Sequence, residues 1–207
     1  KSVNFKIKLR NWNEHDKSYW NQFKIKLNTV NKIAKPVSSY KSDSNSFVFT
    51  TKYKYIIEDP CYVYQFESRV KLYQPYSDFN KWRSNTTTNN IFGYKELPHF
   101  DDILFIASGG KDMLCLWEMG FNAIAPQSES NKLSEAVIDD IKCRFKNIYF
   151  IYDNDQTGIE MSNKFANEYN LNNIIIPNVN DCKDIAELCK KIGLNNTKQI
   201  INNKLKK

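Results

Sequence analysis

Short apolar runs alternate with amphipathic segments throughout the second half of the chain. The apolar runs are rich in β-branched and aromatic residues, which is typical of strands buried on both faces. The sequence predicts strands at residues 103–107, 123–125, 148–152 and 173–176, and helices at residues 112–119, 133–145, 159–169 and 185–192. This βα order predicts a mostly parallel sheet with both faces covered by helices.

The first half has a different pattern. Apolar and basic residues alternate over residues 5–9, as in a half-exposed strand, and the spacing of aromatic residues over 14–23 fits a short helix. A helical turn is predicted at 29–33, Pro36 stops it, and residues 38–46 are polar enough for a loop. Short strands are predicted at residues 47–50, 54–57, 61–66 and 69–73. Their short turns favour an antiparallel meander, so we expect an α+β subdomain over 1–100 and an α/β subdomain over 101–207.

Two carboxylates follow the expected strand 148–152. Asp153 and Asp155 are separated by one residue, so they point the same way in extended backbone, and Gly158 lets the chain turn into the next helix. Ligands of open α/β sheets bind beyond the carboxyl ends of the strands, where a carboxylate pair suits a hard divalent cation such as Mg²⁺. The alternative is an Asp-rich turn that only caps the following helix.

Three further acidic residues stand where other strands should end. Asp112 follows the first strand of the α/β half, Glu129 follows the second, and Asp184 follows the fourth. Each of them alone could be a helix-capping carboxylate. Together, at successive strand ends, they indicate a shared acidic site.

Charge is distributed unevenly around a net charge of +7. Residues 1–100 contain 17 Lys and Arg against 8 Asp and Glu, whereas residues 101–207 contain 13 against 15. The first half is therefore the candidate for binding a phosphate backbone, and the second half for holding metal. A basic surface that serves only solubility is the alternative.

Basic and aromatic residues gather near the end of the basic half. Arg69, Lys71 and Tyr73 alternate onto one face of a predicted strand, and Lys81-Trp82-Arg83 follows closely. Cations that bind phosphate beside rings that stack on bases are typical of sites for single-stranded nucleic acid or nucleotide. The alternative is a solvated strand face beside a half-buried Trp82.

Composition indicates a soluble protein of a reducing, intracellular compartment. The chain is 41% hydrophobic and 26% charged, and no apolar run approaches the roughly 20 residues of a membrane helix. The five cysteines show no zinc-ligand spacing and are expected to be free thiols. Nothing at the start resembles a signal peptide, and we expect a fragment of a longer protein.

The acidic pattern resembles the Toprim domain, and within it the phage-type DNA primases and primase–helicases. Gly109 and Asp112 match the Glu-Gly-x-x-Asp turn of that family, while Asp153, Asp155 and Gly158 match its Asp-x-Asp-x-x-Gly turn. Lys183-Asp184 matches a Lys-Asp pair of the primase branch. Upstream, residues 69–75 and 81–85 are similar to the basic nucleotide- and template-facing region of primases, and residues 12–20 to the entry of that subdomain.

One position departs from the family. Ser108 stands where the family has a glutamate that is assigned to catalysis, and a hydroxyl can neither act as a base at neutral pH nor add charge to a cation site. We hypothesise that Glu129, at the end of the adjacent strand, partly compensates.

The resemblance implies synthesis of short RNA primers on single-stranded DNA from ribonucleoside triphosphates, with Mg²⁺ or Mn²⁺. It assigns metal binding to Asp153, Asp155 and Asp184, and Asp112 belongs to the catalytic set. The compensation hypothesis adds Glu129 to that set. The residues expected to bind nucleotide or template are Arg69, Lys71, Lys81, Trp82, Arg83, Lys111 and Lys183, although Lys111 and Lys183 could instead be solvated neighbours of the acids.

The resemblance also implies further modules in the same full-length chain, a zinc-binding module upstream and a helicase downstream. A degenerate primase domain that only binds DNA and supports a helicase is the second hypothesis, and Ser108 favours it. A Toprim nuclease or topoisomerase is a weaker third. The Asn- and Lys-rich composition would suit a parasite plastid (apicoplast) enzyme or an AT-rich phage, and the sequence does not separate them.

Overall fold

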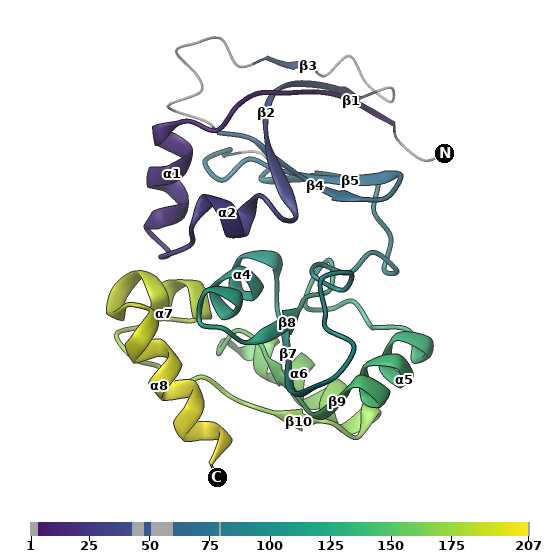
Figure 1. The fold of residues 1–207 in the computed structure, drawn as a ribbon, viewed down its shortest axis with the longest axis vertical. Coiled ribbons are helices and arrows are strands. Elements are labelled where there is room, and N and C mark those ends of the chain that lie inside the picture. Colours follow the sequence, from purple (N-terminus) through teal and green to yellow (C-terminus); the bar gives the residue numbers. More distant parts are fainter. Residues whose placement is uncertain (1–3, 43–47, 51–59, 79, 207) are drawn as a thin grey trace. The chain divides into compact units, whose positions relative to one another are not determined.

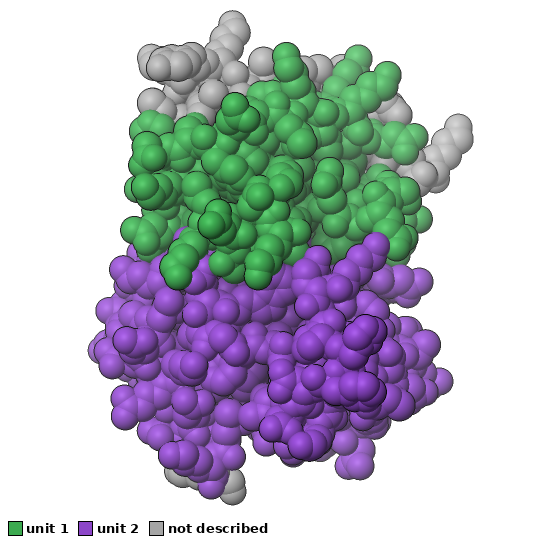
Figure 2. Space-filling model, in the orientation of Figure 1, with its two compact units in different colours: residues 1–21, 26–87 green, residues 22–25, 88–207 purple. Residues whose placement is uncertain are grey.

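The computed structural model describes residues 4–42, 48–50, 60–78 and 80–206. The chain forms two compact units (Figure 2). Unit 1 contains residues 1–21 and 26–87, and unit 2 contains residues 22–25 and 88–207. A four-residue segment of the first half therefore folds with the second half. The assignment of binding to residues 1–100 and of metal to residues 101–207 stays a prediction.

Unit 1 is built on an antiparallel sheet with the order β1-β2-β4-β5-β6, to which β3 adds by pairing with β2 (Figure 1). Its elements are β1 (Phe5–Leu9), α1 (Glu14–Asn21), α2 (Leu27–Val30), β2 (Ala34–Ser42), β3 (Val48–Thr50), β4 (Tyr62–Phe66), β5 (Arg69–Tyr73) and β6 (Trp82–Ser84). Strands β4 and β5 form an antiparallel pair of the expected meander, and β6, which was not predicted, extends it, whereas β3 pairs with β2. The strand predicted at 54–57 lies outside the described residues.

The prediction of a loop over residues 38–46 was wrong for residues 38–42, which belong to β2, and residues 43–46 lie outside the described residues. Strand β2 passes through Pro36, pairing with β4 up to Pro36 and with β1 from Val37 onwards. A proline without an N–H is tolerated where a strand changes partners. Val37 and Tyr40 are buried in the core of the sheet, so the polar composition of 38–42 hid the core position Tyr40.

Ring stacking and a buried ion pair hold α1 against this sheet. Asp16 is fully buried, its carboxylate accepts two hydrogen bonds from Arg10 at 2.5 and 2.8 Å, and it accepts a third from the Tyr62 hydroxyl at 3.0 Å. Trp12 stacks on the Tyr62 ring at 5.9 Å, and Trp20 is fully buried. The aromatic spacing that predicted this helix therefore marks its packed face.

Unit 2 contains a parallel sheet with the order β10-β9-β7-β8. Its elements are β7 (Asp101–Ala107), α4 (Gly110–Glu118), β8 (Asn122–Ile124), α5 (Glu135–Arg144), β9 (Phe145–Ile151), α6 (Gln156–Tyr169), β10 (Asn172–Asn173), α7 (Ile185–Ile192) and α8 (Leu194–Leu205). The expected mixed α/β architecture is confirmed. Strand β10 is shorter than the predicted strand 173–176, and α8 was not predicted.

Helices cover both faces of the parallel sheet (Figure 1). Helices α5 and α6 pack on β9, and Leu104, Ile106 and Phe150 join them in one core. Alternate strand residues such as Phe105 and Ala107 are also fully buried, on the side of α4, against which α7 packs. The strands are therefore apolar at successive positions, as the sequence pattern indicates. Within the described residues, no helix is long and apolar enough to cross a membrane.

Candidate active site

The first acidic side chain lies just beyond the end of β7. Asp112 stands in the first turn of α4 and is only 6% exposed. Its Oδ2 accepts a hydrogen bond from the Ser108 hydroxyl at 3.2 Å, and its Oδ1 accepts one from the Ala186 N–H at 2.9 Å. Burial raises the pKa of Asp112 to about 8; the charge of Asp184 adds to this rise, and Lys111 opposes it. Burial and the neighbouring carboxylate therefore both favour the protonated form of Asp112.

The second acidic group is the turn between β9 and α6. Asp155 is the N-cap of α6, and its Oδ1 accepts a hydrogen bond from the Gly158 N–H at 3.0 Å. Burial and the charge of Asp184 raise the pKa of Asp153, while a hydrogen bond from Ser108 lowers it. Ser108 therefore interacts with both Asp112 and Asp153, at the position where the family's glutamate would stand.

Gly158 brings the start of α6 back onto this turn. A Cβ atom at residue 158 would lie 2.8 Å from the carbonyl carbon of Asp153. Only glycine fits without a shift of the backbone. The Asp-x-Asp-x-x-Gly pattern therefore needs glycine here because any side chain would clash with the backbone of Asp153, and not because of the backbone angles of residue 158.

The third acidic residue begins α7. Asp184 is 8% exposed, and its Oδ1 caps the helix by accepting a hydrogen bond from the Glu187 N–H at 2.6 Å. Lys183 lies beside it, and its Nζ is 3.8 Å from Asp153 Oδ2. Lys183 thus lies close to Asp153, and the charge of Asp184 acts on both Asp112 and Asp153.

Glu129 lies in the same electrostatic field. It follows β8, and partial burial raises its pKa, with Asp153 and Asp155 adding to the rise and Lys183 opposing it. The charges of Asp153 and Asp155 thus act on Glu129, and its compensation for Ser108 stays a prediction.

The donor chemistry of the group suits a hard divalent cation. Asp153, Asp155, Asp184 and Glu129 offer carboxylate oxygens. Burial and, to a lesser extent, neighbouring carboxylates raise the pKa of Asp153 and Glu129, and a bound cation would offset both effects. Among the described residues, however, no three His, Cys, Asp or Glu side chains stand close enough to hold an ion as they are. In Asp155 and in Asp184, one carboxylate oxygen already accepts the hydrogen bond that caps a helix.

The basic and aromatic residues of unit 1 form a separate group on β5 and β6. The Nζ of Lys71 lies 4.5 Å from the centre of the Trp82 ring, which stacks on Tyr73 at 4.2 Å. Lys71 is 9% exposed, and burial lowers its pKa to about 8. Trp82 is 39% exposed. The face is therefore a packed platform rather than a solvated strand.

The other predicted cations have different surroundings. Arg69 donates to the Asn85 carbonyl at 2.5 Å, so it braces the connection after β6. Lys81 is exposed and Arg83 is half-buried. In unit 2, the Nζ of Lys111 lies 4.5 Å from the centre of the Phe23 ring.

Sequence reasoning missed two residues of unit 2. Asn154, between the two aspartates of the turn, hydrogen-bonds to three main-chain carbonyls of residues 176–183. Phe23 lies in the segment 22–25 and contacts Lys111 and Lys190 through its ring. For Asn154 the sequence offered one clue, because it stands between two candidate metal ligands, Asp153 and Asp155. For Phe23 it offered none.

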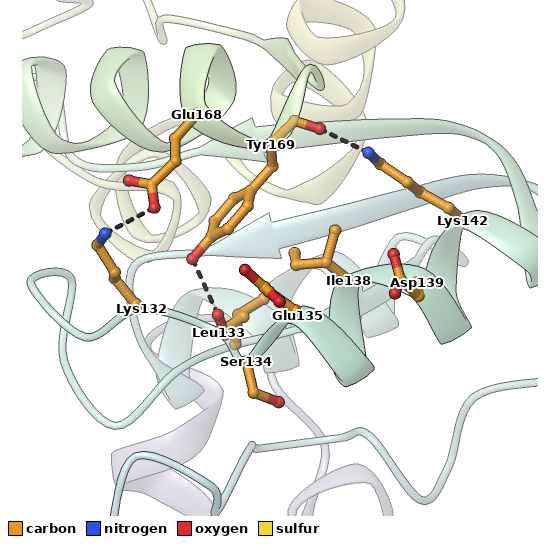
Figure 3. Close-up of a pocket in the computed structure, with 9 residues that line it drawn as sticks. All are labelled: Lys132, Leu133, Ser134, Glu135, Ile138, Asp139, Lys142, Glu168 and Tyr169. Atoms are coloured by element: carbon orange, nitrogen blue, oxygen red, sulfur yellow. Dashed lines mark hydrogen bonds and ion pairs between the residues drawn. The ribbon is translucent and has the colours of Figure 1, made fainter.

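A pocket of about 440 Å³ lies between α5 and α6, away from these residues (Figure 3). Lys132 pairs with Glu168 at 2.6 Å across it, the Tyr169 hydroxyl donates to the Leu133 carbonyl at 2.9 Å, and Lys142 donates to the Tyr169 carbonyl at 2.6 Å. None of the residues that line it is a predicted site residue.

Comparisons with known proteins agree with this architecture. Residues 105–189, from β7 to α7, match the family model described as Toprim-like. No curated protein sequence matches the chain. The chain aligns with a structure of the Aquifex aeolicus primase, comprising its zinc-binding and RNA polymerase domains, with a TM-score of 0.65 and 14% identity. That alignment covers 92% of this chain and 56% of the other, so this chain spans about half of that protein's length.

Two further primase structures have the same fold. The primase fragment of the bacteriophage T7 primase–helicase aligns with a TM-score of 0.58 and 15% identity, over 95% of this chain and 78% of the other. A DNA primase domain from Pseudomonas aeruginosa aligns with a TM-score of 0.58 and 14% identity, over 81% of this chain and 56% of the other. The chain therefore contains a Toprim-like domain within a primase-like fold, and the predicted resemblance is confirmed.

Proposed function

We propose that this chain is the RNA polymerase core of a DNA primase, which makes short RNA primers on single-stranded DNA during replication. One observation carries the proposal. Three carboxylates that follow strand ends of a Toprim-like domain, Asp112, Asp153 and Asp184, influence one another electrostatically, within the fold of primase catalytic domains.

The reaction is nucleotidyl transfer. The 3′-oxygen of one nucleotide attacks the α-phosphorus of a ribonucleoside triphosphate, a phosphodiester bond forms, and pyrophosphate leaves as the bond between the α- and β-phosphates breaks. Asp153, Asp155 and Asp184 would hold Mg²⁺ or Mn²⁺. When bound, the cation neutralises charge on the attacking oxygen and on the phosphates.

The remaining residues of unit 2 shape this site. Asp112 and Glu129 complete the acidic set, and Glu129 supplies the carboxylate that Ser108 lacks. Lys183, which is 3.8 Å from Asp153, is suited to balance its charge and to contact a phosphate of the incoming nucleotide. Lys111, next to Asp112, has the same role in this proposal.

Unit 1 would bind the template and the nucleotide. Lys71, Lys81 and Arg83 supply positive charge, and Trp82 supplies a ring that is exposed enough to stack on a base. Arg69 contributes by holding the chain after β6 in place.

The full-length protein is expected to carry more than this core. The Aquifex structure includes a zinc-binding domain, and the T7 protein is a primase–helicase. We propose that this core likewise works with a zinc-binding module and a helicase in its own chain. A plastid or phage origin remains a prediction from composition alone.

The alternative is a primase-like module that binds single-stranded DNA and supports a helicase without synthesis. One observation favours it. Ser108 replaces the family's glutamate. The two functions share a fold and differ in chemistry, so an activity assay separates them.

The test is primer synthesis on single-stranded DNA with labelled ribonucleotides and Mg²⁺ or Mn²⁺. Template-dependent oligoribonucleotides are expected, and the double variant Asp153→Asn/Asp155→Asn should abolish them. Asp139→Asn, an exposed carboxylate on α5, serves as the matched control and should leave synthesis unchanged. Glu129→Gln should also abolish synthesis, and full activity in this variant would refute the compensation hypothesis.

A negative result is informative if DNA binding is retained. Absence of product both from the chain and from its Ser108→Glu variant, also with an upstream zinc-binding module restored, would support the degenerate module. Cleavage of phosphodiester bonds instead of synthesis would point to a Toprim nuclease.

A further inference from the structure

We propose that Asn154 is a positioning residue that fixes the distance between the Asp153–Asp155 turn and the segment that carries Lys183 and Asp184. The effect of Asn154 on catalysis rests on the proposed function. Its effect on the position of the loop does not, because it follows from hydrogen bonds within the chain.

Asn154 contacts this loop through both its backbone and its side chain. Its N–H donates to the Lys183 carbonyl at 2.8 Å. Its side-chain Nδ2 donates to the Ile176 carbonyl at 3.2 Å and to the Cys182 carbonyl at 3.3 Å. One residue of the acidic turn thus holds both ends of the loop 176–183.

The loop depends on such support because the sheet supplies little. Strand β10 pairs with β9 over Asn172 and Asn173 only, and the Ile174 N–H then donates to the Phe150 carbonyl at 2.8 Å. Beyond that point the chain is irregular until α7, with left-handed backbone at Asn180 and Asp181. The connection that ends in Asp184 is therefore long and lacks a strand of its own.

Few side chains can replace this asparagine. A carboxamide nitrogen carries two hydrogens, and here two carbonyl oxygens lie within hydrogen-bond distance of it. Aspartate has nearly the same shape but offers only oxygens to these carbonyls, so it would repel them. Alanine removes the donors and leaves space. The two substitutions therefore separate the loss of donors from the loss of volume.

The position of the loop sets the position of two candidate site residues. Lys183 Nζ is 3.8 Å from Asp153, and the charge of Asp184 acts on both Asp153 and Asp112. A loop released from Asn154 would move Asp184 away from the other carboxylates. Residues that orient metal ligands typically change metal affinity or activity about 10- to 100-fold when they are mutated.

The experiment compares the 207-residue chain with its Asn154→Asp, Asn154→Ala and Asn122→Ala variants. Asn122 is the matched control. Its side chain also makes two hydrogen bonds, to Asp101 at 2.8 Å and to the Ile103 carbonyl at 3.4 Å, but near the start of β7 rather than at its end. Two properties are measured, the hydrogen exchange of the peptide spanning 176–184 and the affinity for Mn²⁺ by direct titration.

Both Asn154 variants should exchange faster over 176–184 and bind Mn²⁺ at least about tenfold more weakly. Asn122→Ala should match the wild type in both. In primer synthesis, the Asn154 variants should lose kcat at saturating nucleotide and recover part of it at high Mn²⁺, whereas a general loss of stability would not respond to Mn²⁺. Unchanged exchange over 176–184 in both Asn154 variants would overturn the proposal.

The outcomes also separate this proposal from the proposed function. If the wild type makes no primers and binds no Mn²⁺, but Asn154→Ala accelerates exchange of the loop, the positioning role stands and the polymerase function fails. If primers are made and the Asn154 variants match the wild type in all measurements, the function stands and the positioning role fails.

Discussion

At the scale of single residues, Gly158 and Lys71 matter because of the atoms that pack against them. Gly158 lies against the backbone of Asp153, so it sets how closely α6 returns to the acidic turn. Lys71 is a lysine that the fold buries beside Trp82. Each has a consequence that a single substitution measures.

Gly158→Ala should destabilise the chain and move the acidic turn. The new Cβ would lie 2.8 Å from the Asp153 carbonyl carbon, a backbone atom, so the backbone of the turn would have to shift. Such overpacking typically costs about 1–3 kcal/mol. Urea unfolding measures the loss. Gly109→Ala is the control, because a Cβ there meets nothing within 4 Å, and an equal loss in both variants would contradict the contact argument.

Lys71→Met should remove a pH dependence of stability. Burial lowers the pKa of Lys71 to about 8 in the folded state, from 10.5. Between these values the unfolded chain binds more protons, so stability rises with pH through that window, and the cost of burying the charge is fully present below pH 8. The cost has an upper limit of about 3 kcal/mol, since one pKa unit corresponds to about 1.4 kcal/mol.

Urea unfolding at pH 7.5 and at pH 10 measures this effect. The gain in stability of Lys71→Met over the wild type should be larger at pH 7.5 than at pH 10. Lys81→Met serves as the control, because Lys81 is exposed. The same gain at both pH values would show that Lys71 keeps its ordinary pKa.

At the scale of elements, the sequence predicts helices and strands best where buried apolar residues recur at regular positions. Strand β9 was predicted because its apolar run continues through both faces, and the candidate carboxylates followed because parallel strands end at one edge. Helix α8 was missed because Asn and Lys interrupt its apolar positions. Asn154 was missed because its partners are main-chain carbonyls of a distant loop, and hydrogen bonds of that kind leave no trace in residue periodicity.

No pattern in the sequence indicated that the segment Gln22–Ile25 folds with the second half of the chain. It folds with unit 2, where Phe23 is 8% exposed and Ile25 is 1% exposed. The Sγ of Cys115, on α4, donates to the Phe23 carbonyl at 3.7 Å. Local periodicity does not reveal which of two units a short segment joins.

A piece comprising residues 88–207 should therefore lack part of its own core. Cys115 is expected to react faster with a thiol reagent in this piece than in the whole chain, because the Phe23 carbonyl that its Sγ contacts is absent. Mass spectrometry of alkylated peptides measures the rate. Cys143, which is exposed, is the internal standard in both samples. Equal protection of Cys115 in both would show that unit 2 does not need the segment.

At the scale of the whole molecule, charge divides the chain more clearly than sequence motifs do. The first hundred residues carry the excess of Lys and Arg, and the remainder is slightly acidic. Composition alone reveals this division. It does not reveal that Lys71 is buried or that Arg69 is occupied by a carbonyl, because both depend on how β5 pairs with β6.

Affinity for single-stranded DNA should fall with rising salt, and the slope should depend on residues of unit 1. Each phosphate contact contributes about −0.7 to the slope of log K against log salt for single strands. Lys81→Ala should make the slope less steep by about that amount. Lys164→Ala removes an exposed lysine of α6 and should leave the slope unchanged. Fluorescence anisotropy with a labelled oligonucleotide measures both, and equal slopes would remove Lys81 from the DNA contact.

The segment Gln22–Ile25 also has a consequence for folding during synthesis on the ribosome. Phe23 is made 92 residues before Cys115, its partner on α4. At about 5–20 residues per second, that gap lasts on the order of 5–20 s. During this time unit 2 is not yet complete, so the apolar side chains of Phe23 and Ile25 remain uncovered on the nascent chain until the second half has been synthesised.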